Sequence, residues 1–217
     1  MPPNALDPLQ HRVARTALSL PQAHTLALAG GGAMIAHGFT DRPTRDVDLF
    51  TEVDPDEASR VAAALRSRLQ GEGLQVLQAD RPPHNNRFVV ADPTSGSACQ
   101  VEVFPDGGRL RPTVRLDIGP VLHPDDLAAD KMLALWGRAE IRDYADVAAL
   151  LDRYEPVALL QLAAAKDMGF TPARFADALD AIRRFDPEDW TAAGIDPDGA
   201  IRIQNLAAHW SRELRAN

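Results

Sequence analysis

The chain has 217 residues, of which 45% are hydrophobic and 25% charged, and its formal net charge is −8 at pH 7. This length allows one domain or two small ones with a real core, and the acidic balance argues against a general nucleic-acid binder. A single cysteine, Cys99, excludes an intrachain disulfide and a zinc site built from several cysteines.

The sequence offers no membrane segment and no export signal. No apolar run approaches the roughly 18 residues that suggest a membrane span. The first residues lack the basic-then-apolar pattern of a signal peptide, so we expect a cytoplasmic protein. Charge is uneven along the chain, because residues 60–120 hold eight arginines against six acidic residues. These arginines either bind an RNA end or are simply solvated.

The first elements surround a run of three glycines. Residues 9–20 predict a helix, and residues 26–29 predict a short apolar strand that leads into the glycines. A helix of small residues is expected over 33–37. Glycines let the backbone approach a phosphate closely, and the following helix start offers unpaired N–H groups. Gly31 and Gly32 are therefore candidate nucleotide-binding residues.

The next apolar segment carries two carboxylates, Asp46 and Asp48. Side chains at i and i+2 of a strand point to the same face, and like charges held there repel unless a cation lies between them. Hard oxygen ligands of this kind suit Mg²⁺, which usually binds one or two carboxylates plus substrate phosphates. The pair therefore predicts a site for Mg²⁺ and a nucleoside triphosphate. Arg45 contacts a phosphate or the acceptor there, or else pairs with a carboxylate.

The following residues predict a mixed or antiparallel sheet. Asp54 can cap a helix over 55–69, with Pro55 at its first position. In the alternating segment 100–104, Glu102 lies on the opposite face from Val101 and Val103. On this pattern alone Glu102 is a solvent-facing residue, and the sequence does not show whether its side matches that of the two aspartates. Strands are expected over 74–78, 87–91, 98–104 and 114–118.

The composition changes near residue 122, where strand signals end and alanine and leucine become frequent. We therefore expect an α/β module over 1–122 and an α-helical module over 123–217. Lys131 is one of only two lysines in the chain, and an ammonium group can hold phosphates as a point charge. The alternative for Lys131 and the nearby Asp143 and Asp146 is a solvated helix face with ion pairs. Helices are expected over 124–138, 141–151, 156–168, 172–185 and 199–214.

Two blocks together resemble a known family. The pair Gly31-Gly32, thirteen intervening residues and then Asp46-Val47-Asp48 resemble the signature of the DNA polymerase β-like nucleotidyltransferase superfamily. The flanking residues are most similar to the AbiEii/AbiGii toxin group, which shows R-x-[ST]-x-D-[IV]-D. The second block is a helix lysine followed by R-D-x-x-D. In this chain these residues are Arg42, Thr44, Asp46, Asp48, Lys131, Arg142, Asp143 and Asp146.

The resemblance implies a nucleotidyltransferase fold whose active site is completed by the helical module. Asp46 and Asp48 would be catalytic and hold Mg²⁺, with Glu102 as a third metal carboxylate from a later strand. Lys131 would bind the triphosphate and take part in catalysis. Asp146 would orient Lys131 or a nearby arginine, or contribute to catalysis, with Asp143 as the alternative for that role.

The same resemblance implies a toxin of a toxin–antitoxin system. Such a toxin would transfer a nucleotide from an NTP to an RNA 3′ end, with tRNA as the acceptor, and so block translation. A cognate antitoxin would then be a partner, and no membrane partner is expected. Two alternatives stay open: the acceptor is a small molecule such as an aminoglycoside or a protein side chain, or the chain is a nucleotide-binding module without turnover.

Overall fold

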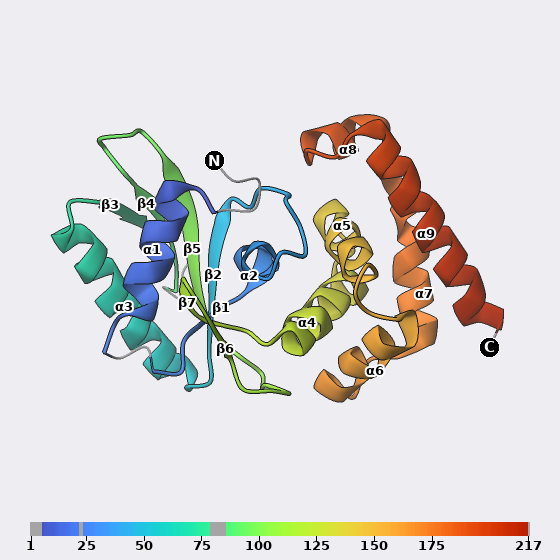
Figure 1. The fold of residues 1–217 in the computed structure, drawn as a ribbon, viewed down its shortest axis with the longest axis horizontal. Coiled ribbons are helices and arrows are strands. Elements are labelled where there is room, and N and C mark those ends of the chain that lie inside the picture. The colour runs from blue at the N-terminus through green and yellow to red at the C-terminus, as the bar shows by residue number, and fades with distance from the viewer. Residues whose placement is uncertain (1–5, 22–23, 79–85, 217) are drawn as a thin grey trace. The chain divides into compact units, whose positions relative to one another are not determined.

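The chain divides into two compact units, Met1–Pro124 and Asp125–Asn217. A computed structural model describes residues 6–21, 24–78 and 86–216. The first unit combines a mixed sheet with helices, and the second consists of helices (Figure 1). The expected fold class, an α/β module followed by a helical module, is therefore confirmed.

The first unit is built on a seven-stranded sheet in the order β3-β4-β5-β2-β1-β7-β6. The neighbours β2 and β5 are parallel, and so are β1 and β7, whereas the other neighbouring pairs are antiparallel. The two central strands β5 and β2 carry the candidate carboxylates. The strands are β1 Ala27–Leu28, β2 Asp46–Thr51, β3 Gln75–Gln78, β4 Arg87–Ala91, β5 Ala98–Pro105, β6 Val114–Leu116 and β7 Gly119–Val121.

Three helices belong to this unit, namely α1 Pro8–Leu18, α2 Gly30–Ala36 and α3 Pro55–Gly71. Asp7 and Asp54 cap α1 and α3 by accepting hydrogen bonds from backbone N–H groups of the first turn. Helices α1 and α3 lie on one side of the sheet and α2 lies on the other (Figure 1). Strand β2 is thus covered on both faces.

Alternation along β2 and β5 separates an apolar face from a polar face. Val47, Leu49, Val101 and Val103 are fully buried. Burying a side chain of this size contributes about 1.5–3 kcal/mol, so slipping either strand by one residue would expose this face. The apolar side chains therefore hold Asp46, Asp48 and Glu102 on the opposite face.

Two features of this unit differ from the expectations. The glycine run is not a turn before a helix: Gly30 is the first residue of α2, and its φ of +57° is open to glycine at little cost. The strand expected over 114–118 ends at Leu116, because a turn reverses the chain into the unpredicted β7. That hairpin matters for the sheet because β7 pairs with β1.

The second unit is helical and has an aromatic core. Proline occupies the first turn of α6, α7 and α8, where its missing N–H removes no helix bond. Helix α9 packs against α5, α7 and α8, and the rings of Phe175 and Trp210 meet edge to face at 5.1 Å. The helices are α4 Pro124–Gly137, α5 Ile141–Leu150, α6 Pro156–Lys166, α7 Pro172–Asp180, α8 Pro187–Ala192 and α9 Pro197–Ala216, with a 3₁₀ turn at Ala181–Arg184.

The expected helix over 172–185 ends early, because its last turn is that 3₁₀ turn. Helix α8 was not expected from the sequence. Among the described residues, none of the helices combines the length and the apolar character that crossing a membrane requires.

Candidate active site

The parallel pairing of β2 with β5 aligns the carboxylates. Asp48 is opposite Glu102, and Asp46 is opposite Gln100. Side chains at paired positions of neighbouring strands point to the same face of a sheet. Glu102 therefore shares the face of the two aspartates, which the sequence alone left open.

Arg87 holds the carboxylate of Glu102. Its Nε and Nη2 atoms donate to the two carboxylate oxygens at 2.8 and 2.7 Å, across the pairing of β4 with β5. Burial raises the pKa of Glu102, whose residue is 8% exposed, and Arg87 acts in the opposite direction. The pKa of Arg87 is raised, mainly by its hydrogen bonds to Glu102 and further by Asp46 and Asp48. The guanidinium group thus lies within electrostatic reach of all three carboxylates.

The glycine run makes room for this polar face. A Cβ atom at Gly30 would lie 1.7 Å from Oδ2 of Asp48, and one at Gly31 would lie 2.7 Å from Oγ1 of Thr44. Gly32 differs, because its Cβ would meet the side chain of Leu28 in β1 at 3.1 Å. The structure therefore brings Gly30 and Gly31 to the polar groups of the site, whereas Gly32 allows α2 to pack on the sheet.

Arg45 directly precedes β2 and is exposed. Its backbone carbonyl accepts a hydrogen bond from Gln100 N at 3.4 Å. Within the part of the chain that the structure describes, its guanidinium group makes no hydrogen bond or ion pair. The carboxylate pairing left open by the sequence is therefore not formed among these residues.

The donor set fits a magnesium ion held by the two aspartates. Mg²⁺ commonly takes one or two carboxylates and completes its shell with phosphates and water. In residues 6–21, 24–78 and 86–216, no group of three or more His, Cys, Asp and Glu side chains is arranged to hold a metal ion. Glu102 shares the right face, but both of its oxygens are bonded to Arg87. Asp46 and Asp48 are thus the residues that would hold the ion.

The second unit brings Lys131 and Asp146 together. Nζ of Lys131 on α4 lies 2.8 Å from Oδ2 of Asp146 on α5. Both residues are buried, at 8% and 1% exposure. A buried ion pair is weak evidence for stability, because taking both charges out of water is costly. The pair is therefore not the exposed, weakly interacting helix face that was the alternative from the sequence.

Asp143 lies only three residues before Asp146 but has different partners. It accepts two hydrogen bonds from the Arg138 guanidinium at 2.9 and 2.8 Å and one from Glu140 N at 3.0 Å. Its residue is fully buried. These bonds stabilise the corner between α4 and α5. The two aspartates of the R-D-x-x-D motif therefore have different partners, Arg138 and Glu140 N for Asp143 and Lys131 for Asp146.

Sequence reasoning missed Gly30 and Arg87. Gly30 stands in the glycine run, but only the contact with Asp48 distinguishes it from its neighbours. Arg87 is one of many arginines, and only the strand register places it beside Glu102. Neither position carries a signal that a single sequence could have revealed.

The fold is similar to that of solved structures from two other organisms. The protein JHP933 from Helicobacter pylori is 14% identical, with a TM-score of 0.55 over 98% of this chain and 96% of that chain. MenT4, a nucleotidyltransferase toxin from Mycobacterium tuberculosis, is 15% identical, with a TM-score of 0.52 over 93% of this chain and 92% of that chain. At these identities the likeness shows the fold alone.

The model of the AbiEii nucleotidyltransferase toxins of type IV toxin–antitoxin systems matches residues 14–215. The chain therefore belongs to the AbiEii nucleotidyltransferase toxin family. This membership implies a nucleotide substrate and a cognate antitoxin. No curated protein matches the chain by sequence.

Proposed function

We propose that this nucleotidyltransferase uses Mg²⁺ to transfer a nucleotide from an NTP to the 3′ end of an RNA. We propose tRNA as the acceptor, because extending its 3′ end would prevent aminoacylation and so block translation. The reaction would take place in the cytoplasm and would be held in check by the antitoxin.

The observation that carries this proposal is the polar face of β2 and β5. Asp46 and Asp48 lie two residues apart on one strand, and Glu102 is aligned with Asp48 on the next. Gly30 leaves the space that the Asp48 carboxylate occupies. An arrangement held by strand register and helix packing is rigid enough to position a metal–triphosphate complex.

In the proposed reaction, the acceptor hydroxyl oxygen forms a bond to the α-phosphorus of the NTP. The bond from that phosphorus to the bridging oxygen breaks, pyrophosphate leaves, and the hydroxyl proton is released to water. When bound, a magnesium ion would supply positive charge for the triphosphate and lower the pKa of the attacking hydroxyl. Asp46 and Asp48 would hold this ion, and Arg45 would contact a phosphate or the acceptor.

Other residues would bind the triphosphate. Lys131 would supply a point charge, with Asp146 fixing the position of its ammonium group at 2.8 Å. Gly31 at the start of α2 would keep side chains away from the nucleotide, whereas Gly32, which packs α2 against Leu28, would contribute only its backbone. We propose that the helical module completes the active site through Lys131, and that Glu102 acts as a metal ligand only when Arg87 releases it.

A transfer assay tests the proposal. The purified protein would be incubated with Mg²⁺, total tRNA and each of four NTPs radiolabelled at the α-phosphate, beside the Asp48→Asn variant. We expect label on tRNA with the parent protein and background label with the variant. Asp152→Asn, at an exposed position of the second unit, is the matched control and should label tRNA like the parent.

Other results would point to the alternatives. Label on an aminoglycoside or on a protein, with none on tRNA, would contradict the proposed acceptor but keep the transferase chemistry. Absence of label with every acceptor, although NTP binds, would favour a nucleotide-binding module. Equal labelling by the parent and Asp48→Asn would remove the metal site from the mechanism.

A further inference from the structure

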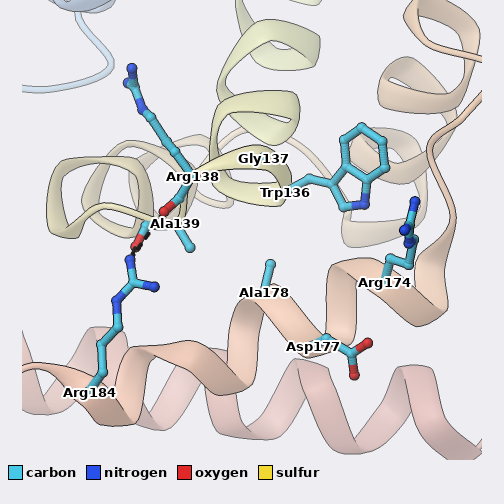
Figure 2. Close-up of a pocket in the computed structure, with 8 residues that line it drawn as sticks. All are labelled: Trp136, Gly137, Arg138, Ala139, Arg174, Asp177, Ala178 and Arg184. Atoms are coloured by element: carbon cyan, nitrogen blue, oxygen red, sulfur yellow. Dashed lines mark hydrogen bonds between the residues drawn. The ribbon is translucent and has the colours of Figure 1, made fainter.

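The second unit contains a pocket of about 440 Å³ beside the corner between α4 and α5. Its volume falls in the range of roughly 300–1,000 Å³ that is typical of ligand sites. Figure 2 shows Trp136 from the end of α4 and Arg138 just after that helix, with Arg174 on α7 and Arg184 on the 3₁₀ turn. The pocket is lined by Trp136, Gly137, Arg138, Ala139, Arg174, Asp177, Ala178 and Arg184.

Two of the charged residues in the lining are already neutralised. Arg138 is bonded to the buried Asp143 at 2.9 and 2.8 Å, and its guanidinium group points away from Arg174 and Asp177 (Figure 2). Asp177 is paired with Arg215 at 2.7 Å. These residues therefore add little net charge to the pocket.

The other two arginines keep their positive charge. Among the residues that the structure describes, Arg184 donates only through Nη2, to the backbone oxygens of Arg138 at 3.1 Å and Ala139 at 2.6 Å. The side chain of Arg174 makes no hydrogen bond or ion pair with any residue that the structure describes. The surrounding unit is acidic, because residues 125–217 hold 17 Asp and Glu against 11 Lys and Arg. Two uncompensated arginines in one pocket of an acidic unit favour an anionic ligand.

Trp136 adds an aromatic surface to the same pocket. Its ring packs against Phe170, with centroids 5.8 Å apart, and its residue is only partly buried. The other two tryptophans, Trp190 and Trp210, are 2% and 4% exposed. A partly exposed indole next to arginines suits a ligand that has both a flat ring and a phosphate, as nucleotides do.

We infer that this pocket binds a single-stranded RNA segment, with one base stacked on Trp136 and with separate phosphates of the segment bonded to Arg174 and to Arg184, which lie on different sides of the pocket (Figure 2). The inference rests on the proposed function, in which the acceptor is RNA. An acidic peptide would use the arginines but would leave the indole without a stacking partner, so the lining favours RNA. A free mononucleotide shares the same chemistry and is separated from RNA by the experiment.

Trp136 reports on the pocket directly, because stacking changes the fluorescence of a partly exposed indole. The full chain would be titrated with a single-stranded RNA oligomer, with AMP, with an acidic peptide and with inorganic phosphate, without NTP. We expect saturable quenching by the oligomer at concentrations at least tenfold lower than by AMP, and no quenching by the other two. The quenching should be absent from Trp136→Phe, which keeps an aromatic ring but removes the reporter.

Charge-matched variants test the arginines. Arg174→Gln should weaken oligomer binding about threefold to tenfold, and Trp136→Ala should weaken it about tenfold by fluorescence anisotropy of labelled RNA. Arg202→Gln is the control, because Arg202 is exposed and lies near the start of α9. Arg215, which pairs with the pocket residue Asp177, lies near the other end of that helix. The RNA affinity of Arg202→Gln should equal that of the parent, and melting curves would show that all variants are folded.

The results separate this inference from the proposed function. If the oligomer quenches the fluorescence but the protein transfers no nucleotide to RNA, RNA binding in the pocket stands and RNA as the acceptor is contradicted. If RNA is the acceptor but its KM is equal in the parent, Arg174→Gln and Trp136→Ala, RNA binding in the pocket is contradicted and RNA as the acceptor stands. Quenching by AMP or the acidic peptide at lower concentrations than by the oligomer would also overturn the inference.

Discussion

At the scale of single residues, the carboxylate of Asp48 lies where a side chain at position 30 would be. We predict that Gly30→Ala abolishes nucleotide transfer, because the new Cβ would lie 1.7 Å from Oδ2 of Asp48 and must displace it. A left-handed alanine also destabilises the fold by about 1–2 kcal/mol. Transfer rates and thermal melting would be measured together.

Gly96→Ala is the control for backbone strain. Gly96 has a φ of +74°, and a Cβ there would meet no atom within 4 Å. Gly96→Ala should lose only the stability that the left-handed backbone costs and should keep its activity, whereas Gly30→Ala should lose at least as much stability and also its activity. Equal activity in both would show that the position of Asp48 does not depend on Gly30.

Arg87 donates hydrogen bonds to both carboxylate oxygens of Glu102, and these oxygens are the atoms with which Glu102 would bind a metal ion. We predict that Arg87→Gln binds divalent cations more tightly than the parent, because both Glu102 oxygens lose their guanidinium partner and the site loses a positive charge. Binding of Mn²⁺, a spectroscopic substitute for Mg²⁺, would be measured by electron paramagnetic resonance in the absence of NTP.

The double change Arg87→Gln with Glu102→Gln is the matched control. It removes the same arginine but leaves no third carboxylate, so any gain in Mn²⁺ affinity that depends on Glu102 should disappear. An equal gain in both variants would mean that Arg87 acts only through its charge. Unchanged affinity in Arg87→Gln would contradict the prediction.

At the scale of elements, most helices and strands could be predicted but their pairing could not. Among the described residues, the sequence indicated the α-helices except α8, mostly by amphipathic periodicity or by proline at a helix start. Helix α8 has six residues and is too short to show a period. The strand β7 was missed because three residues that include glycine and proline carry no strand pattern. The alignment of Asp48 with Glu102 depends on register between strands far apart in sequence, which one sequence does not reveal.

The corner between α4 and α5 depends on Asp143. We predict that Asp143→Ala lowers the free energy of unfolding by about 2–3 kcal/mol, because the Glu140 N–H loses its acceptor and Arg138 loses its buried partner. Urea unfolding would measure the loss. Asp152→Ala removes an exposed carboxylate from the same unit and should change stability by no more than about 0.5 kcal/mol.

The ion pair of Lys131 with Asp146 has a different expected role. We predict that the double change Lys131→Met with Asp146→Leu keeps stability within about 2 kcal/mol of the parent, because apolar residues commonly replace a buried pair without loss. Binding of the NTP should nevertheless weaken by at least tenfold if Lys131 holds the triphosphate. A folded double variant with parental NTP affinity would assign the pair to structure alone.

At the scale of the whole molecule, an enzyme with a net charge of −8 is proposed to act on a polyanion. Such a chain cannot attract RNA by its overall field, so its affinity must come from a few local cations. We assign this role to the exposed Arg45 and to the pocket residues Arg174 and Arg184. Few phosphate contacts mean that few counterions are released on binding.

We therefore predict a shallow dependence of RNA affinity on salt. For single strands, the slope of log K against log [salt] is about −0.7 for each phosphate contact, so three contacts give about −2. Anisotropy titrations over a series of KCl concentrations would measure it, and Arg174→Gln should reduce the slope by about 0.7 while Arg202→Gln leaves it unchanged. A slope steeper than about −5 would require a broad basic surface and would contradict this prediction.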